Sequence, residues 1–116
     1  MKPKLLVVVT SDPQTSGRPA EAIRIAAGVG TWKKAEVSVY LRGPAIRALS
    51  EFVDELIDED NFNRYLPLVG EFGRPVWVQR GAVELQDLGA APVKFSEIGD
   101  TELAALVSQA TYVLRF

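Results

Sequence analysis

The first apolar run of the chain limits its possible folds more than any other stretch. Residues 4–10 read Lys-Leu-Leu-Val-Val-Val-Thr and lead into a polar loop, residues 11–18, that contains Pro13 and Gly17. An apolar run without alternation is typical of a strand buried on both faces. An apolar helical pattern then begins at Pro19. This order indicates a central buried strand that leads through a loop into a helix.

Strands and helices alternate along the rest of the chain. We expect further strands over residues 35–41, 75–79, 92–95 and 111–116. We expect helices over 19–31, from Pro44 to about Ile57, from about Leu66 to Phe72, and from a cap at Asp100 or Thr101 onward, with a weak helical turn in 81–91 that stops at Gly89. The alternation implies parallel pairing, right-handed crossovers and helices on both faces of one open sheet. The sequence therefore predicts one α/β domain over residues 1–116, but the order of the strands cannot be read from it.

Three local patterns add more detailed predictions. Thr15, Ser16 or Gly17 can cap the first helix, and Pro19 suits its first turn. Pro67 lacks a backbone N–H, so we expect no uninterrupted helix from residue 61 to 72. Within the second strand, apolar residues alternate with Glu36, Ser38 and Tyr40. This alternation predicts that one face of the second strand, the face that carries Tyr40, is less buried than in the first strand.

The absence of cysteine and histidine excludes several kinds of chemistry. The 116 residues contain no cysteine and no histidine, and the net charge is −2. Disulfides, thiolate nucleophiles, thiolate zinc sites and imidazole acid–base catalysis are therefore ruled out. The charge argues against general nucleic-acid binding, and no apolar run approaches the roughly 18 residues of a membrane span. We read the N-terminus as mature structure and expect a cytoplasmic protein without nucleic-acid or membrane partners.

The polar residues at the ends of the strands form the candidate site. Ligands of open α/β sheets bind at the carboxyl ends of the strands. The residues expected at this edge are Thr10, Ser11 and Asp12 after the first strand, Arg42 and Gly43 after the second, Gln79 and Arg80 after the third, and Arg18 at the start of the first helix. Three arginines beside a helix N-terminus favour an anion. We therefore hypothesise a pocket for a small anion or phosphate, and the alternative is that the arginines are solvated or paired with neighbouring acids.

Known nucleotide and metal motifs are missing from the chain. Loop 11–18 has only Gly17 and no Lys-Ser/Thr pair, so it is not a P-loop, and Gly28-Val29-Gly30 lies at a helix end. The acidic run 54–60 does not have the spacing of an EF-hand loop, and we interpret it as a solvated helix face. We predict no catalytic residue, no metal ligand and no cofactor. An enzyme that works through Asp12 and a bound metal or cofactor stays open as a weaker alternative.

Aromatic residues near the strands point to the core or to subunit contacts. Trp77 and Phe95 lie on short strands and fit a core or an interface better than a base-stacking platform. We expect residues 112–116 to form an apolar strand that ends at an aromatic residue. The apolar side chains of such a strand are favourably buried against another chain. The sequence therefore predicts a homo-oligomer.

The whole chain resembles the DsrE/DsrF-like (DsrEFH) family, which includes sulfur-relay subunits of tRNA thiolation and dissimilatory sulfur oxidation. The matching features are the run 5–10, the Ser-Asp-Pro loop, the helix pattern 22–26, the strand 36–41 with Gly43, the strand 76–78, and the ending from Glu102-Leu103 to residues 114–116. The resemblance implies a three-layer α/β/α domain with a five-stranded parallel sheet, in the flavodoxin/Rossmann-like topology class. It also implies assembly into homotrimers or hexamers, or into hetero-oligomers with related subunits.

The same resemblance locates a difference in chemistry. In relay members a cysteine just after the third strand carries a persulfide, and here that position falls at Gln79 or Arg80. Because no thiolate is present, this chain can carry no persulfide. We therefore interpret it as a non-catalytic DsrE-like domain that acts as an oligomeric structural or binding subunit. A small-ligand or anion binder that uses the arginines of the strand ends is the alternative.

Overall fold

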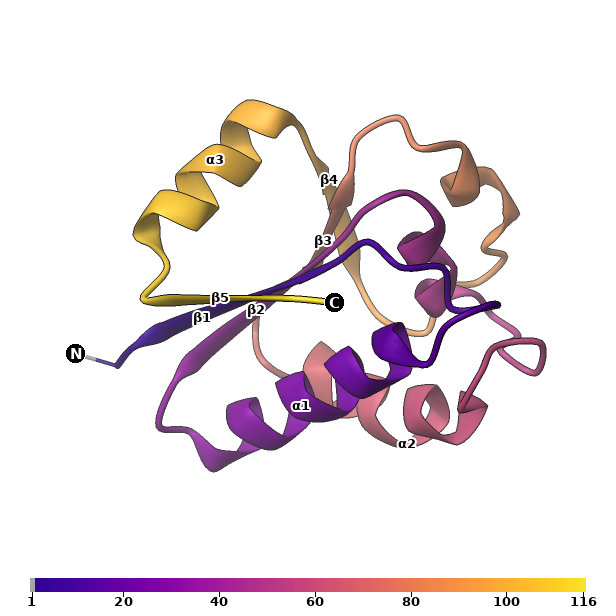
Figure 1. The fold of residues 1–116 in the computed structure, drawn as a ribbon, viewed down its shortest axis with the longest axis horizontal. Coiled ribbons are helices and arrows are strands. Elements are labelled where there is room, and N and C mark those ends of the chain that lie inside the picture. The colour runs from indigo at the N-terminus through magenta and orange to yellow at the C-terminus, as the bar shows by residue number, and fades with distance from the viewer. Residues whose placement is uncertain (1) are drawn as a thin grey trace.

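A computed structural model describes residues 2–116, and these form one α/β domain (Figure 1). The elements follow in the order β1 (Lys4–Val9), α1 (Arg18–Trp32), β2 (Glu36–Leu41), the short 3₁₀ helix η1 (Gly43–Leu49), α2 (Glu59–Gly70), β3 (Val76–Gln79), the short 3₁₀ helix η2 (Val83–Asp87), β4 (Phe95–Ile98), α3 (Asp100–Gln109) and β5 (Tyr112–Arg115).

The five strands form a parallel sheet in the order β4-β3-β2-β1-β5. The chain moves stepwise from β1 to β4 at one edge, and α3 then carries it back across the sheet to β5 at the other edge. As Figure 1 shows, α1 and α2 cover one face and α3 covers the opposite face. The predicted parallel sheet with helices on both faces is confirmed.

The main hydrophobic core lies between the sheet and α1 and α2. Alternate residues of β1, including Val7 and Val9, face this layer and are fully buried. The matching surface of α1 consists of Ala20, Ala22, Ile23, Ala26 and Ala27. Because most of these side chains are small, α1 can lie close to the strands.

The second face of the sheet is covered by α3 alone. Leu6, Val8, Tyr40 and Ile98 form a smaller buried cluster there, against the apolar side of α3. Tyr40 is only 1% exposed. The prediction that the face of β2 carrying Tyr40 is less buried is therefore wrong at this residue, because the C-terminal helix folds back over it.

Two helix predictions in the middle of the chain are also wrong. The expected helix from Pro44 to Ile57 is the 3₁₀ helix η1, which ends at Leu49. Its buried residues are Ala45, Ile46, Ala48 and Leu49, whose spacing of three suits a 3₁₀ helix. The expected break before Pro67 is absent, since α2 continues through this proline. Phe62, Leu66 and Val69 bury one side of α2, and this burial offsets the unfavourable helix propensity of proline.

The remaining differences are shifts at element ends. The fourth strand runs over Phe95–Ile98 and not over 92–95, because an edge strand with one buried residue, Ile98, gives a weak apolar pattern. Residues 54–58 precede α2, so only the end of the acidic run lies on a helix. The helix caps are Gly17 for α1 and Gly99 for α3, where Glu102 Oε1 accepts a hydrogen bond from the Gly99 N–H.

Candidate functional site

The carboxyl edge of the sheet brings most of the predicted site residues to one end of the molecule. The loop after β1 is tied to the end of β5, because the backbone N–H groups of Thr10 and Ser11 both point to the carbonyl oxygen of Phe116, at 3.0 and 3.4 Å. Arg18 donates from Nη2 to the Arg115 carbonyl at 3.0 Å and lies over the Phe116 ring. This arginine therefore belongs to the β1–β5 side of the edge.

Asp12 holds the shape of the loop between β1 and α1. Its Oδ1 accepts a hydrogen bond from the Gln14 N–H at 2.9 Å, and its backbone carbonyl accepts from the N–H groups of Thr15 and Ser16. The Oδ2 atom lies 4.0 Å from Nη1 of Arg47. Asp12 was the residue considered for the enzyme alternative. In the structure its carboxylate stabilises a local turn.

Arg42 lies near the N-terminus of α3, on the other side of the edge. Its Nη1 donates to the Tyr40 hydroxyl at 3.0 Å and to Asp100 Oδ1 at 3.1 Å. The hydrogen bond to Asp100, and then that to Tyr40, raises the pKa of Arg42. The guanidinium therefore connects the end of β2 to the first turn of α3.

The residues at the end of β3 make two further connections. Gln79 Oε1 accepts a hydrogen bond from the Gly43 N–H at 3.0 Å, which ties β3 to the turn after β2. Arg80 Nη2 donates to Glu102 Oε1 at 2.8 Å. The position that the family resemblance gives to a relay cysteine is therefore filled by side chains that connect β2, β3 and α3.

The predicted arginines thus separate into two groups. Arg18 lies with β5, whereas Arg42 and Arg80 lie with the first turn of α3. Each has a partner within the chain, so an anion at this edge has to compete with Asp100 and Glu102 or with a backbone carbonyl. The small-anion pocket stays a prediction, and the geometry points to a network that holds the edge together.

An acidic hollow of about 600 Å³ lies beyond this network, beside η1 and η2. Five carboxylates line it, from Glu51, Asp54, Glu55, Glu84 and Asp87, together with Arg47. Glu51 Oε1 accepts a hydrogen bond from the Ala90 N–H. Within residues 2–116, no three acidic side chains come close enough to hold a metal ion.

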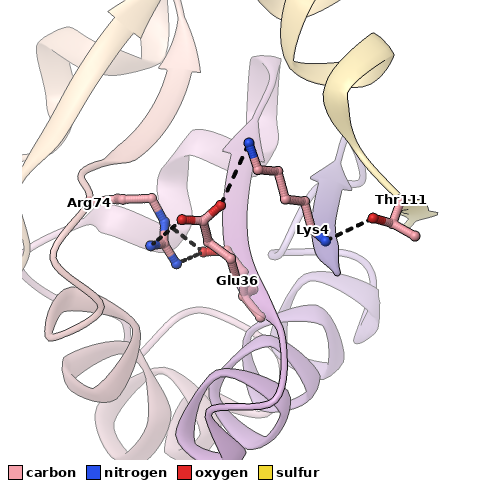
Figure 2. Close-up of polar contacts among 5 residues, drawn as sticks. Lys4, Glu36, Arg74 and Thr111 are labelled. Carbon is pink, nitrogen blue, oxygen red and sulfur yellow. Dashed lines mark hydrogen bonds and ion pairs between the residues drawn. The ribbon is translucent and has the colours of Figure 1, made fainter. Parts of the chain in front are cut away.

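The opposite, amino edge of the sheet carries a second polar cluster (Figure 2). Glu36 Oε2 lies 4.0 Å from Lys4 Nζ, and Glu36 Oε1 lies 3.6 Å from Arg74 Nη1. Arg74 also donates from Nε to the Val37 carbonyl at 3.1 Å. The Lys4 N–H donates to Thr111 Oγ1 and so ties the start of β1 to the segment before β5. No role for this edge was predicted from the sequence.

Several residues of both edges were missed from sequence. Asp100 was interpreted only as a possible helix cap and Glu102 only as part of the ending that matches the family, although they bind Arg42 and Arg80. Their pairing depends on the crossover of α3, which no local pattern reveals. Tyr40 and Trp77 could have been linked only through the register that places them side by side on β2 and β3.

None of the helices within residues 2–116 combines the length and the apolar character needed to cross a membrane.

Comparison with known proteins identifies a solved structure of similar fold. No protein-family profile matches the chain. No curated protein matches it in sequence. A crystal structure of the ychN protein from E. coli superposes with a TM-score of 0.78 at 18% sequence identity, covering 100% of both chains. The chain therefore has the same fold as that protein, an α/β domain with a five-stranded parallel sheet.

Proposed function

We propose that this chain is a non-catalytic DsrE-like domain that works as an oligomeric structural or binding subunit. The full-length likeness to the ychN protein, a DsrE/DsrF-like sulfur-relay family member, supports the relationship. The proposal keeps the cytoplasmic location expected from the sequence.

The single observation that carries the proposal is the pair of residues at the end of β3. The family resemblance puts the position of the relay cysteine at Gln79 or Arg80, and the 116 residues contain no thiol. A persulfide needs a thiolate sulfur, which glutamine and arginine cannot supply. Both side chains instead bond to the neighbouring Gly43 and Glu102. In a relay subunit the end of the third strand would carry the persulfide. In this chain the residues there connect β3 to the turn after β2 and to α3.

Exposed apolar side chains support the oligomeric part of the proposal. On edge strand β5, Tyr112 is 64% exposed and Leu114 is 38% exposed. Their register partners on β1, Leu5 and Val7, are buried. An edge strand with apolar side chains is a surface that proteins commonly cover by association. The proposed assembly is a homotrimer or hexamer, or a hetero-oligomer with related subunits.

Two measurements test the proposal. In the first, the protein is incubated with polysulfide, desalted and assayed for bound sulfane sulfur by cyanolysis. We expect no bound sulfur, while the Arg80→Cys variant, which restores a thiol at this position, serves as the positive control. Sulfane sulfur bound to the unmodified protein would refute the non-catalytic assignment.

The second measurement is the mass in solution by light scattering. We expect a multiple of the 12.7 kDa chain mass. A monomer at every concentration would contradict homo-oligomer formation. In that case, affinity capture of a related DsrE-like subunit would test the hetero-oligomer. A monomer in light scattering together with no captured subunit would refute the subunit role.

A further inference from the structure

We propose that the groove between α2 and the edge strand β4 binds an extended segment of an acidic partner protein, which pairs with β4 as an additional strand of the sheet. This groove, called here the β4 groove, has a volume of about 1020 Å³. Its apolar lining includes Pro67 of α2, Pro75 before β3, and Pro92, Val93 and Phe95 around the start of β4. The proposal does not depend on the subunit role, because β4 and β5 lie at opposite edges of the sheet.

The outer side of β4 has no neighbouring strand, since β4 is the last strand of the sheet. The Lys94 carbonyl accepts a hydrogen bond from the Val76 N–H at 3.0 Å and so points toward β3. Backbone groups alternate in direction from residue to residue along a strand. Those of Phe95 and Glu97 therefore point away from β3. They offer the donors and acceptors with which an added strand pairs.

The two faces of β4 differ in chemistry. Val93, just before the strand, packs against the core beside α2, whereas Ile98 packs in the cluster beneath α3. Because side chains alternate along a strand, Phe95 lies on the α2 side with Val93, and Lys94 lies on the α3 side with Ile98. Phe95 lines the groove and is 36% exposed. An added strand thus meets an aromatic ring on one face and an ammonium group on the other, which fits alternating apolar and acidic side chains.

The charge at this end of the molecule selects an acidic partner. The amino end of the sheet, defined here as residues 2–4, 33–36, 71–75 and 90–94, holds six cationic side chains, from Lys2, Lys4, Lys33, Lys34, Arg74 and Lys94. Its two acids, Glu36 and Glu71, leave a net charge of +4, although the whole chain has −2. Lys4 and Arg74 share Glu36 (Figure 2). Lys94 has no ion-pair partner within residues 2–116, so its charge is available to an acid.

A peptide fits this surface better than a nucleic acid, which is the other kind of polymer that a basic surface attracts. The free N–H and C=O groups of β4 match a peptide backbone, and the apolar groove matches apolar side chains. The residues outside the amino end carry −6, because the whole chain has −2 and the amino end has +4. This negative charge repels a long polyanion more than it repels a short acidic segment.

Labelled peptides test the charge selection. The probe is a fluorescein-labelled Glu-Val-Glu-Val-Glu-Val peptide, called the glutamate peptide, and its binding is followed by fluorescence anisotropy. We expect binding in the micromolar range that weakens as the salt concentration rises. The same peptide with lysine in place of glutamate, and a labelled single-stranded DNA oligonucleotide, are expected to bind at least about tenfold more weakly.

Methylation of the peptide backbone tests the strand pairing. One glutamate peptide carries N-methyl groups on its three valines, and a second carries them on its three glutamates. Only one of these two sets of N–H groups can face β4, because N–H groups alternate along a strand. We therefore expect one methylated peptide to bind at least about tenfold more weakly than the glutamate peptide, and the other to bind as well as it does.

A pair of charge reversals locates the peptide on the protein. Lys94→Glu reverses a charge that lines the groove and is expected to weaken binding of the glutamate peptide at least about tenfold. Lys34→Glu reverses a charge at the same end of the molecule but outside the groove, and this matched control should change the affinity by less than about threefold. Both residues are exposed, and melting curves check that both variants are folded.

Five results would overturn the proposal. No binding of the glutamate peptide at 1 mM would leave β4 without such a partner. Equal binding of the lysine peptide would remove the charge selection, and tighter binding of the oligonucleotide would assign the basic end to nucleic acid. Full binding of both methylated peptides would exclude strand pairing. Unchanged affinity in the folded Lys94→Glu variant would place the peptide outside the β4 groove.

Discussion

At the scale of single residues, the carboxyl edge contrasts a half-buried hydrogen bond with an exposed ion pair. Gln79 accepts a hydrogen bond from the Gly43 N–H in a partly buried environment. The next residue, Arg80, pairs with Glu102, but its side chain is 60% exposed. Water can replace the partner of an exposed charge more easily than that of a half-buried amide. The two neighbours should therefore differ in their contributions to stability.

We predict that Gln79→Ala lowers the free energy of unfolding by about 1 kcal/mol, because the Gly43 N–H loses its acceptor. Arg80→Ala is the matched control and should change it by less than about 0.5 kcal/mol. Urea denaturation of the three proteins measures both values. An equal loss in the two variants would show that the ion pair matters as much as the amide.

A second prediction at this scale concerns the loss of stability in acid. Glu21 and Arg24 form a hydrogen-bonded ion pair on the solvent side of α1, and the hydrogen bond from Arg24 lowers the pKa of Glu21 below its usual 4.5. Since the pKa is lower in the folded state, the pair stabilises the fold above about pH 4.5. This contribution disappears as the pH falls through the folded pKa. It is small, because both groups are exposed.

We therefore expect the melting temperature of the unmodified protein to exceed that of Glu21→Gln near neutral pH. The difference should shrink below about pH 4.5. Thermal melts across this range measure it. A difference that grows toward acid would contradict the assigned direction of the pKa shift.

At the scale of elements, the contact between α1 and α2 depends on a glycine. A side chain at Gly30 would collide with the ring of Phe72, which follows α2, whereas a side chain at Gly28 would meet no atom within 4 Å. Both glycines lie in the last two turns of α1. They therefore allow the same substitution to be compared with and without a steric conflict.

We predict that Gly28→Ala raises the free energy of unfolding by about 0.5–1 kcal/mol, because alanine is the better helix former. Gly30→Ala should lower it by about 1–3 kcal/mol, because the Phe72 ring must move. Chemical denaturation of both variants measures the difference. A gain in stability at both positions would mean that Phe72 yields at little cost.

The elements also show which predictions a local pattern can support. The continuous apolar run of β1 and the helical spacing of small residues in α1 identified both elements, because each signal lies within its own segment. The continuation of α2 through Pro67 could not be read locally, since it depends on the burial of Phe62, Leu66 and Val69 against other elements. The same holds for the edge strand β4, whose position depends on pairing with β3.

At the scale of the whole molecule, the crossover of α3 decides what the candidate site contains. The sequence correctly predicted that Arg42 and Arg80 follow strands, but the acids that meet them come from α3, which returns across the sheet from the far edge. Strand order could not be read from the sequence, so the pairing of these arginines with acids of α3 could not be predicted. The partners of a strand-end residue are a property of topology and not of the local sequence.

The whole-molecule prediction concerns the exposed face of β5. We expect the double substitution Tyr112→Glu and Leu114→Lys to shift the protein to monomers, because it places charges on the proposed contact surface. Val83→Glu changes an equally exposed apolar residue of η2 and is the matched control, which should keep the assembly. Light scattering reports the mass of each variant. Dissociation of Val83→Glu alone would place the contact at η2 and not at β5.

The central position of β1 has a consequence for biosynthesis. This strand pairs with β2 on one side and with β5 on the other, and the bond from the Lys4 N–H to Thr111 joins residues 107 positions apart. During synthesis, one side of this apolar strand therefore stays unpaired until β5, about 107 residues further along the chain, has left the ribosome. Such an open strand is prone to aggregate with other nascent chains. The nascent domain thus needs chaperone protection over the whole interval before β5 is made.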